Sequence, residues 1–309
     1  MSPSASEAPR VWLEADDENR PRLAEAIRAG GGTLAPLELA EAIVWAADRP
    51  HDLQLRLHPG IRWVQLWSAG IEDWFAAGVI DDQRQWTAAK GVYSRPVAEY
   101  VVAMLLAGAR SLSEVIRTRR WEPRDVRTLA GATVGILGAG GIGAATVELL
   151  RPLGSHVLAV TRGGRTIDGA AESLGVDGID RVVAESDFLV LAAPDTSATR
   201  RLLDARRFEL MNRRPWIVNV GRGTLIDTNA LVEALLAGKL RGAALDVTDP
   251  EPLPEDHPLW ALPNVIITAH TANTSALGAS ACAARVRDNV SRFRSHEPLL
   301  GLVDVEHGY

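Results

Sequence analysis

The chain has 309 residues, a formal net charge of −6 at pH 7, 47% hydrophobic residues and 23% charged residues. This length allows two domains with sizeable cores, and the composition is that of an ordinary soluble globular protein. The acidic balance argues against nucleic acid or an anionic membrane surface as the main partner. Cys282 is the single cysteine, so an intrachain disulfide and a cysteine metal cluster are excluded, and no metal site is expected.

The N-terminus lacks the features of a targeting segment. Met1–Arg10 has no apolar core of the kind found in secretory signals, and no apolar run in the chain reaches membrane-spanning length. We therefore expect a cytoplasmic protein with no membrane partner.

Strand-like and helical stretches alternate between residues 11 and 67. Val11–Leu13 is typical of a strand and Arg20–Arg28 of a helix; Ala42–Ala46 and Ile61–Trp67 are typical of strands with a helical segment between them. This βαβαβ succession predicts a parallel sheet with helices on its faces. It contains no glycine-rich phosphate loop, so we do not expect a nucleotide site in this part of the chain.

Pro96–Arg117 is predicted to form a long helix, with the proline suitably placed in its first turn. The segment is apolar nearly all round between Val101 and Ala107, which indicates burial between domains or subunits. Gly108 weakens the prediction of one unbroken helix, because glycine lowers helix propensity.

A glycine loop follows. Thr133–Leu137 is typical of a buried strand, Gly138–Gly143 has the pattern GxGxxG, and Ala144–Leu150 is helical in pattern. In such a dinucleotide-binding unit the first glycine makes the tight turn, the second lets the backbone approach the pyrophosphate, and the third packs helix on strand. The helix N-terminus then offers free N–H groups to the phosphates.

The residues after the next strand, His156–Val160, bear on the choice of cofactor. An acidic residue commonly holds the adenosine ribose of NAD at this position. Here Thr161 is followed by Arg162 and Arg165, and the first acid is Asp168. Arginines pair with a 2′-phosphate that a carboxylate would repel, so we predict a preference for NADP(H), with NAD possible. The alternative is that both arginines are solvated loop charges.

Four further runs are predicted to be strands: Asp187–Ala193, Trp216–Val220, Gly242–Val247 and Val265–His270. Ligands of open parallel sheets bind at the carboxyl ends of the strands. The residues at or just after the carboxyl ends of these strands therefore join the candidate site: Ala193, Pro194, Val220, Arg222, Asp246 and His270. A cation, a carboxylate and an imidazole beside a dinucleotide are what hydride transfer to a carbonyl group requires.

Several linked motifs now point to one family. They are Gly138–Gly143, Asn219–Asp227, Leu245–Leu253 and Asn264–His270, with Ser68–Gly70 and Val97–Glu99 before them. In this order and spacing the chain resembles the D-isomer-specific 2-hydroxyacid dehydrogenases, and the resemblance covers nearly its whole length. The resemblance implies reduction of a small 2-oxo acid to a D-2-hydroxy acid, with glyoxylate or hydroxypyruvate favoured.

By position, the resemblance implies catalytic roles for three residues. Arg222 would be the catalytic arginine, His270 the acid/base histidine and Glu251 the carboxylate that supports the histidine. A carboxylate beside an imidazole favours its protonated form, ready to donate to the substrate oxygen. Each residue alone also fits an ordinary role, as a surface arginine, a structural histidine or a solvated loop acid.

The same resemblance implies contacts with substrate and cofactor. Backbone N–H groups at Ala69 and Gly70 would help hold the substrate carboxylate, although Ser68–Gly70 alone also fits an ordinary strand-to-helix turn. The expected substrate contacts are Ser68, Ala69, Gly70, Arg222 and His270. The expected cofactor contacts are Gly138, Gly140, Gly141, Ile142, Gly143, Thr161, Arg162, Arg165, Ala193, Pro194, Val220 and Asp246, the last at the nicotinamide end.

Some positions depart from the family pattern. Ala269 stands where proline usually precedes the histidine, Thr248 replaces a common phenylalanine, and Thr271–Asn273 differ from frequent residues. Substrate identity is therefore open. The alternatives are another dehydrogenase of the family, acting on phosphoglycerate or formate, or a non-catalytic NAD(P)-sensing protein.

The expected fold is α/β with two doubly wound parallel-sheet domains. A Rossmann dinucleotide-binding domain is expected at residues 101–273, and a smaller flavodoxin-like substrate domain at residues 1–100 and 274–309. The resemblance implies an active site in the cleft between them. It also suggests a homodimer to which Pro96–Arg117 contributes.

Overall fold

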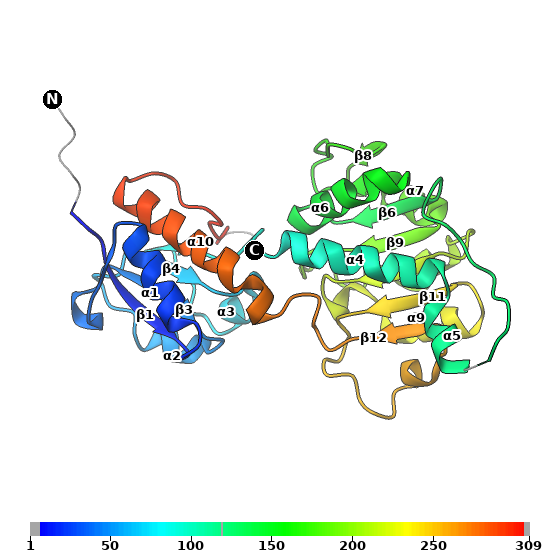
Figure 1. Ribbon diagram of the computed structural model, residues 1–309, viewed down its shortest axis with the longest axis horizontal. Coiled ribbons are helices and arrows are strands. Elements are labelled where there is room, and N and C mark those ends of the chain that lie inside the picture. Colours follow the sequence, from blue (N-terminus) through cyan, green and yellow to red (C-terminus); the bar gives the residue numbers. More distant parts are fainter. Residues whose placement is uncertain (1–6, 119, 306–309) are drawn as a thin grey trace. The chain divides into compact units, whose positions relative to one another are not determined.

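The computed structural model describes residues 7–118 and 120–305. The chain divides into two compact units (Figure 1). Unit 1 comprises Met1–Tyr93 and Thr274–Tyr309, and unit 2 comprises Ser94–Asn273. The expected boundary after residue 100 falls inside a helix that belongs wholly to unit 2, so unit 2 begins at Ser94 instead of residue 101. The expected range 274–309 extends past the described residues at its end.

Unit 1 is built on a five-stranded parallel sheet in the order β2-β1-β3-β4-β5. The strands are β1 (Arg10–Ala15), β2 (Thr33–Leu34), β3 (Ala42–Ala46), β4 (Trp63–Leu66) and β5 (Gln85–Thr87). This is the flavodoxin-like order, as expected. The sequence did not indicate β2 and β5, because strands of two and three residues are too short to show alternation.

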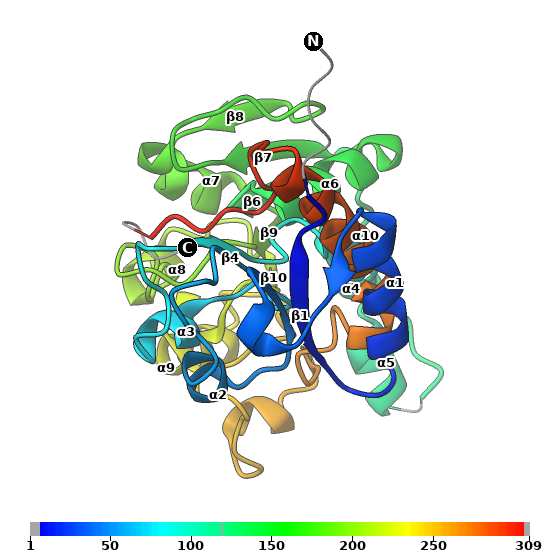
Figure 2. The same cartoon turned by 90° about the vertical axis from the view of Figure 1, so that its left-hand side faces the viewer.

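Helices cover both faces of this sheet (Figure 2). Helices α1 (Arg20–Ala29) and α10 (Ser275–Arg294) lie side by side on one face, and α2 (Pro50–Gln54) and α3 (Glu72–Ala76) lie on the other. A short 3-10 turn, η1, spans Leu37–Leu39. The end of α1 approaches α10 closely, since a Cβ on Gly30 would lie 2.5 Å from the Arg287 carbonyl oxygen. Segments from the two ends of the sequence therefore share one core.

Unit 2 is built on a seven-stranded parallel sheet in the order β12-β11-β10-β9-β6-β7-β8. The strands are β6 (Thr133–Leu137), β7 (His156–Val160), β8 (Glu172–Leu174), β9 (Phe188–Leu191), β10 (Trp216–Asn219), β11 (Gly242–Leu245) and β12 (Val265–Ile267). This is the Rossmann order with a further edge strand, and the strand order reverses between β6 and β9. Both expected parallel sheets are confirmed.

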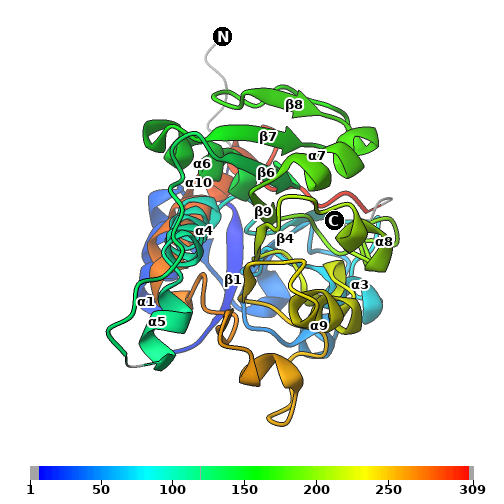
Figure 3. The same cartoon turned by 90° about the vertical axis from the view of Figure 1, so that its right-hand side faces the viewer.

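The helices of unit 2 lie on both faces of its sheet (Figure 3). Helices α4 (Ser94–Ala109) and α6 (Gly141–Leu150) lie on one face, and α7 (Ile179–Glu185), α8 (Ala205–Glu209) and α9 (Thr228–Leu236) on the other. Helix α5 (Leu112–Thr118) follows α4. Short 3-10 turns span Arg151–Leu153, Val176–Gly178, Gly223–Leu225 and Pro258–Ala261.

The predicted long helix over Pro96–Arg117 is two helices. The break lies at Ser111, whose φ of 51° is left-handed and cannot continue an α-helix. Gly108 lies within α4 and has a packing role instead, because a Cβ there would lie 2.2 Å from Cδ2 of the buried Trp216 indole on β10. The glycine lets α4 lie directly on the sheet.

Replacing Gly108 with alanine should therefore destabilise unit 2, although alanine is the better helix former. We expect a loss of roughly 1–3 kcal/mol, the usual cost of inserting a methyl group into a filled core, measured by chemical denaturation. Gly163→Ala is the matched control, because no heavy atom lies within 4 Å of its Cβ position. Equal stability of the two variants would contradict the packing role.

Candidate active site

The predicted cofactor and catalytic residues of unit 2 lie at the carboxyl edge of its sheet. Strands β9 to β12 end one to three residues earlier than the sequence patterns suggested, so the candidate residues lie in the loops that follow them. These residues are Ala193 and Pro194 after β9, Val220 and Arg222 after β10, Asp246 after β11 and His270 after β12. Because these strands are neighbours, their loops line one edge.

The glycine loop has the geometry of a phosphate cradle. Gly138 has a φ of 97°, and a Cβ on it would lie 2.5 Å from the Ala193 nitrogen; a Cβ on Gly143 would lie 2.8 Å from the Gly138 oxygen. By contrast, no heavy atom lies within 4 Å of the Cβ position of Gly140. Helix α6 begins at Gly141, so first-turn N–H groups are available there for an anionic ligand. The residues present fit a dinucleotide pyrophosphate.

The arginine loop after β7 folds back onto the glycine loop. Arg165 Nη2 donates to the Ala139 carbonyl oxygen at 3.4 Å, and the Thr161 hydroxyl donates to the Arg165 carbonyl oxygen at 3.5 Å. Arg162 is exposed beside them. The Arg165 guanidinium group thus contacts the glycine loop, and the first acidic residue after β7 is Asp168.

The turn that carries Arg222 is held by a buried amide. Asn219 is 1% exposed; its Nδ2 donates to the Arg222 carbonyl oxygen at 2.9 Å, and its Oδ1 accepts from the Gly221 N–H at 3.1 Å. A Cβ on Gly223 would lie 1.9 Å from the Thr248 carbonyl oxygen, so this turn packs against the loop that carries Glu251. The sequence pattern did not assign a role to Asn219, although a polar residue at the end of an apolar strand is a signal that could have pointed to it.

His270 and Glu251 form the expected pair. His270 Nδ1 lies 2.7 Å from Glu251 Oε1, and Glu251 Oε2 accepts from the Thr248 N–H at 3.4 Å. Because a carboxylate only accepts, the hydrogen of this contact lies on Nδ1, which directs Nε2 to another partner. Both side chains are about half exposed, 52% for His270 and 42% for Glu251, so a substrate can reach the imidazole.

Asp246 holds the backbone of the histidine segment. The side chain is buried, with 2% exposure. The Asp246 carbonyl oxygen accepts from the His270 N–H at 2.9 Å, Oδ1 accepts from the Thr271 N–H at 2.8 Å, and Oδ2 accepts from the Ala272 N–H at 3.0 Å. His270 has a φ of 53°, a left-handed conformation that non-glycine residues rarely adopt. Asp246 stabilises that conformation.

In unit 1, Ser68–Gly70 follow strand β4. The Ser68 carbonyl oxygen accepts from the Ala89 N–H at 2.9 Å, and the Trp67 carbonyl oxygen accepts from the Tyr93 hydroxyl at 2.8 Å. Within the described part of the chain, the N–H groups of Ala69 and Gly70 donate to no protein acceptor, and the buried Ser68 hydroxyl has no partner. The turn therefore has backbone donors available for an anionic group.

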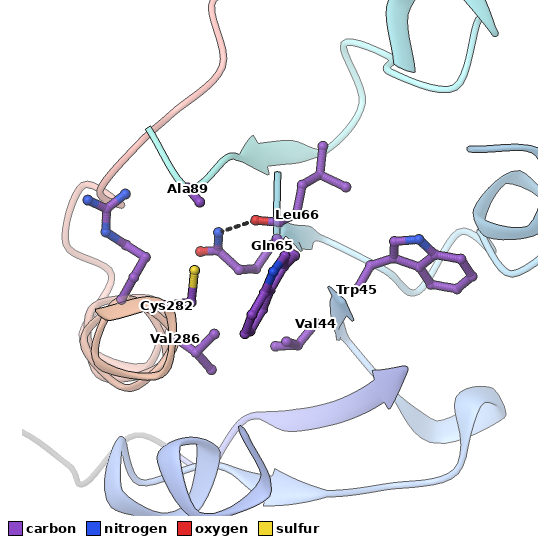
Figure 4. A pocket seen from close by; sticks show the side chains of 9 residues that line it. Val44, Trp45, Gln65, Leu66, Ala89, Cys282 and Val286 are labelled. Atoms are coloured by element: carbon purple, nitrogen blue, oxygen red, sulfur yellow. Dashed lines mark hydrogen bonds between the residues drawn. The ribbon is translucent and has the colours of Figure 1, made fainter. Parts of the chain in front are cut away.

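A small pocket in unit 1 adjoins this turn (Figure 4). Cys282 and Val286 on α10 lie opposite Gln65 and Val44 of the sheet. The pocket contains none of the predicted site residues. Cys282 Sγ lies 2.9 Å from the Tyr93 hydroxyl oxygen, and burial raises the pKa of both groups.

The described residues show neither a metal centre nor a transmembrane helix. In residues 7–118 and 120–305, no group of three or more His, Cys, Asp or Glu side chains is placed to hold a metal ion. Of the helices in these same residues, none combines the length and apolar character needed to cross a membrane.

The glycine loop lies at the strand-order reversal of a Rossmann sheet, and an arginine, a carboxylate and a carboxylate-paired imidazole follow along the same edge. This arrangement is typical of nicotinamide-dependent oxidoreductases. The family model described as "D-isomer specific 2-hydroxyacid dehydrogenase, NAD binding domain" matches residues 101–272. The chain belongs to the D-isomer-specific 2-hydroxyacid dehydrogenase family.

Individual relatives agree with this assignment. An uncharacterized protein in the proB 3′ region of Corynebacterium melassecola is 39% identical over 82% of this chain and 85% of its own length. The glyoxylate reductase of Aeropyrum pernix is 36% identical over 61% of this chain and 60% of its own length. A solved D-isomer-specific 2-hydroxyacid dehydrogenase from Xanthobacter autotrophicus, in complex with NADPH and MES, is 29% identical with a TM-score of 0.86, covering 99% of this chain and 100% of that one.

Proposed function

We propose that this protein reduces a small 2-oxo acid, glyoxylate or hydroxypyruvate, to the D-2-hydroxy acid with a nicotinamide cofactor, reversibly. The observation that carries the proposal is the 2.7 Å contact of His270 with Glu251, at the same sheet edge as the glycine loop and the Arg222 turn. The similarity to a glyoxylate reductase supports the choice of substrate.

His270 is the proposed proton donor. Glu251 engages Nδ1, so Nε2 carries the transferable proton to the substrate carbonyl oxygen. When bound, the cofactor supplies the hydride that reaches the carbonyl carbon. Arg222 orients the carbonyl and carboxylate oxygens through its planar guanidinium group.

The remaining proposed contacts are to the substrate carboxylate and the cofactor. Ala69 and Gly70 bind the carboxylate through their N–H groups, beside Ser68. Gly138–Gly143 bind the pyrophosphate, and Ala193, Pro194 and Val220 border the nicotinamide. We also propose that Asp246 approaches the nicotinamide: it accepts three hydrogen bonds through its two oxygens, and a carboxylate has room for a fourth.

We propose NADP(H) as the preferred cofactor, with NAD(H) as a weaker alternative. Arg162 and Arg165 lie on the loop after β7, where a ribose 2′-phosphate would be bound, and Arg165 already contacts the glycine loop. The NADPH complex of the Xanthobacter relative supports this preference.

A panel of 2-oxo acids tests substrate and cofactor together. Oxidation of NADPH and NADH is followed with glyoxylate, hydroxypyruvate, pyruvate and bulkier 2-oxo acids, and dehydrogenation of phosphoglycerate and formate is assayed in parallel. We expect the highest kcat/KM with NADPH as the cofactor and either glyoxylate or hydroxypyruvate as the substrate. In the double variant Arg162→Ala and Arg165→Ala, the NADPH-to-NADH ratio of kcat/KM should fall about tenfold, since two charge-assisted contacts are lost.

Three outcomes of this panel contradict parts of the proposal. Equal or better use of NADH removes the cofactor preference, and faster turnover of phosphoglycerate or formate changes the substrate. Cofactor binding with no turnover of any acid identifies a sensing protein instead of an enzyme.

Substitution of the histidine tests the catalytic role. His270→Gln should lower kcat by about 10²-fold or more, because a general acid is lost, while the Kd for NADPH stays within about twofold. Glu251→Gln should lose less, because the proton donor remains and only the carboxylate that holds Nδ1 is replaced by an amide of similar shape. The exposed His296, changed to Gln, is the matched control. Wild-type turnover by His270→Gln would exclude the histidine from proton transfer.

We further propose a cytoplasmic homodimer that forms through α5 and the segment after it. Large apolar side chains are exposed there, those of Leu112, Val115, Ile116, Trp121 and Val126, and contiguous exposed apolar patches mark protein–protein contacts. Light scattering should give twice the mass of one chain, and Ile116→Glu should give monomers. A wild-type protein that remains monomeric at micromolar concentration would contradict the dimer.

A further inference from the structure

Three side chains form a hydrogen-bonded chain that leads from helix α4 to the histidine segment. The Tyr100 hydroxyl on α4 is hydrogen-bonded to the Thr268 hydroxyl after β12, and Thr268 Oγ1 lies 2.6 Å from Asp246 Oδ1. Thr268 is also fixed by its backbone, since its N–H donates to the Leu245 carbonyl oxygen at 3.0 Å. Neither Tyr100 nor Thr268 belongs to the residues assigned to cofactor, substrate or proton transfer.

Both hydrogen bonds of the Tyr100–Thr268–Asp246 chain are donated in the direction of Asp246. The Asp246 carboxylate only accepts, so Thr268 must use its single hydroxyl hydrogen on Asp246. The Thr268 oxygen then accepts, and Tyr100 must be the donor. Burial and the charge of Asp246 both raise the pKa of Tyr100, which keeps the phenol protonated for this purpose.

The hydrogen-bonded chain ends at the Asp246 carboxylate, which also holds the backbone next to His270. Oδ1 of Asp246 accepts from both the Thr268 hydroxyl and the Thr271 N–H, and Oδ2 accepts from the Ala272 N–H. The rotation of the carboxylate determines where both N–H groups can bond. Without the Thr268 hydroxyl, one of the three donors that fix this rotation is lost. His270, with its left-handed backbone, directly precedes these two N–H groups.

We propose that Tyr100 and Thr268 are positioning residues for the proton donor: the Tyr100–Thr268–Asp246 chain orients the Asp246 carboxylate, which sets the position of the His270 imidazole. The inference rests on the proposed function of His270. Tyr100 acts only through Thr268, because its hydroxyl is committed to that residue. A misplacement of a proton donor lowers the rate of the chemical step more than it lowers binding.

Four variants separate positioning from general stabilisation. Thr268→Val keeps the side-chain shape and removes the hydroxyl, Thr268→Ser keeps the hydroxyl, and Tyr100→Phe removes only the phenolic oxygen. The fourth variant combines Tyr100→Phe with Thr268→Val. Thr128→Val is the matched control, since the exposed Thr128 hydroxyl bonds only to the Ala130 carbonyl oxygen outside the site. All are assayed well below their unfolding temperatures.

We expect kcat for 2-oxo acid reduction to fall about tenfold in Thr268→Val and severalfold in Tyr100→Phe, while KM for the acid and Kd for NADPH change less than about twofold. Thr268→Ser and Thr128→Val should retain wild-type kcat. The double variant should match Thr268→Val alone, because Tyr100 has no other route to the site.

Several results overturn the proposal: a Thr268→Ser variant as impaired as Thr268→Val, additive losses in the double variant, or undiminished kcat in Tyr100→Phe. Amide hydrogen exchange at Thr271 and Ala272 supplies a readout without turnover. It should be faster in Thr268→Val and Tyr100→Phe and unchanged in Thr268→Ser. If the wild type reduces no 2-oxo acid, the proposed function fails, whereas unchanged exchange in all variants rejects the positioning chain itself.

Discussion

The buried carboxylate of Asp246 is the group on which the geometry of the unit 2 site depends. Its side chain accepts two backbone N–H groups of the segment after β12, and its own carbonyl oxygen accepts the N–H of His270. These bonds hold His270 in a backbone conformation that costs free energy on its own. Burying a carboxylate is tolerated only when hydrogen bonds replace water, and the same bonds fix the imidazole beside Glu251. Stability and chemistry therefore use the same contacts.

Glycines impose the second constraint, because they decide how closely the loops of the sheet edge can approach. Ala193 lies between Gly138 and Gly221, where a Cβ on either glycine would lie within 2.7 Å of its backbone. Gly223 brings the arginine turn against Thr248, which in turn donates its N–H to Glu251. Gly140, by contrast, has no heavy atom within 4 Å of its Cβ position, and a pyrophosphate would approach there. The motif glycines are thus divided between internal packing and ligand access.

The sequence predicted both parallel sheets and most of their strands, because long apolar runs alternate with helical patterns and end in recognisable turns. It missed β2, β5 and β8, which are too short to show a period, and it joined α4 to α5 because the apolar pattern continues across Ser111. Glu251 and His270, 19 residues apart in the chain, were paired by resemblance, and the structure brings them into contact. The bonds that Thr268 makes to Tyr100 and Asp246 join residues 168 and 22 positions apart in the chain, which no local pattern encodes.

We propose that this edge of unit 2 takes part in the stereospecific reduction of a 2-oxo acid. The measurement that tests it most directly is the configuration of the product formed from hydroxypyruvate and NADPH, determined by chiral chromatography. We expect D-glycerate as the single enantiomer. Formation of L-glycerate, of a racemate, or of no glycerate by a protein that binds NADPH would contradict it.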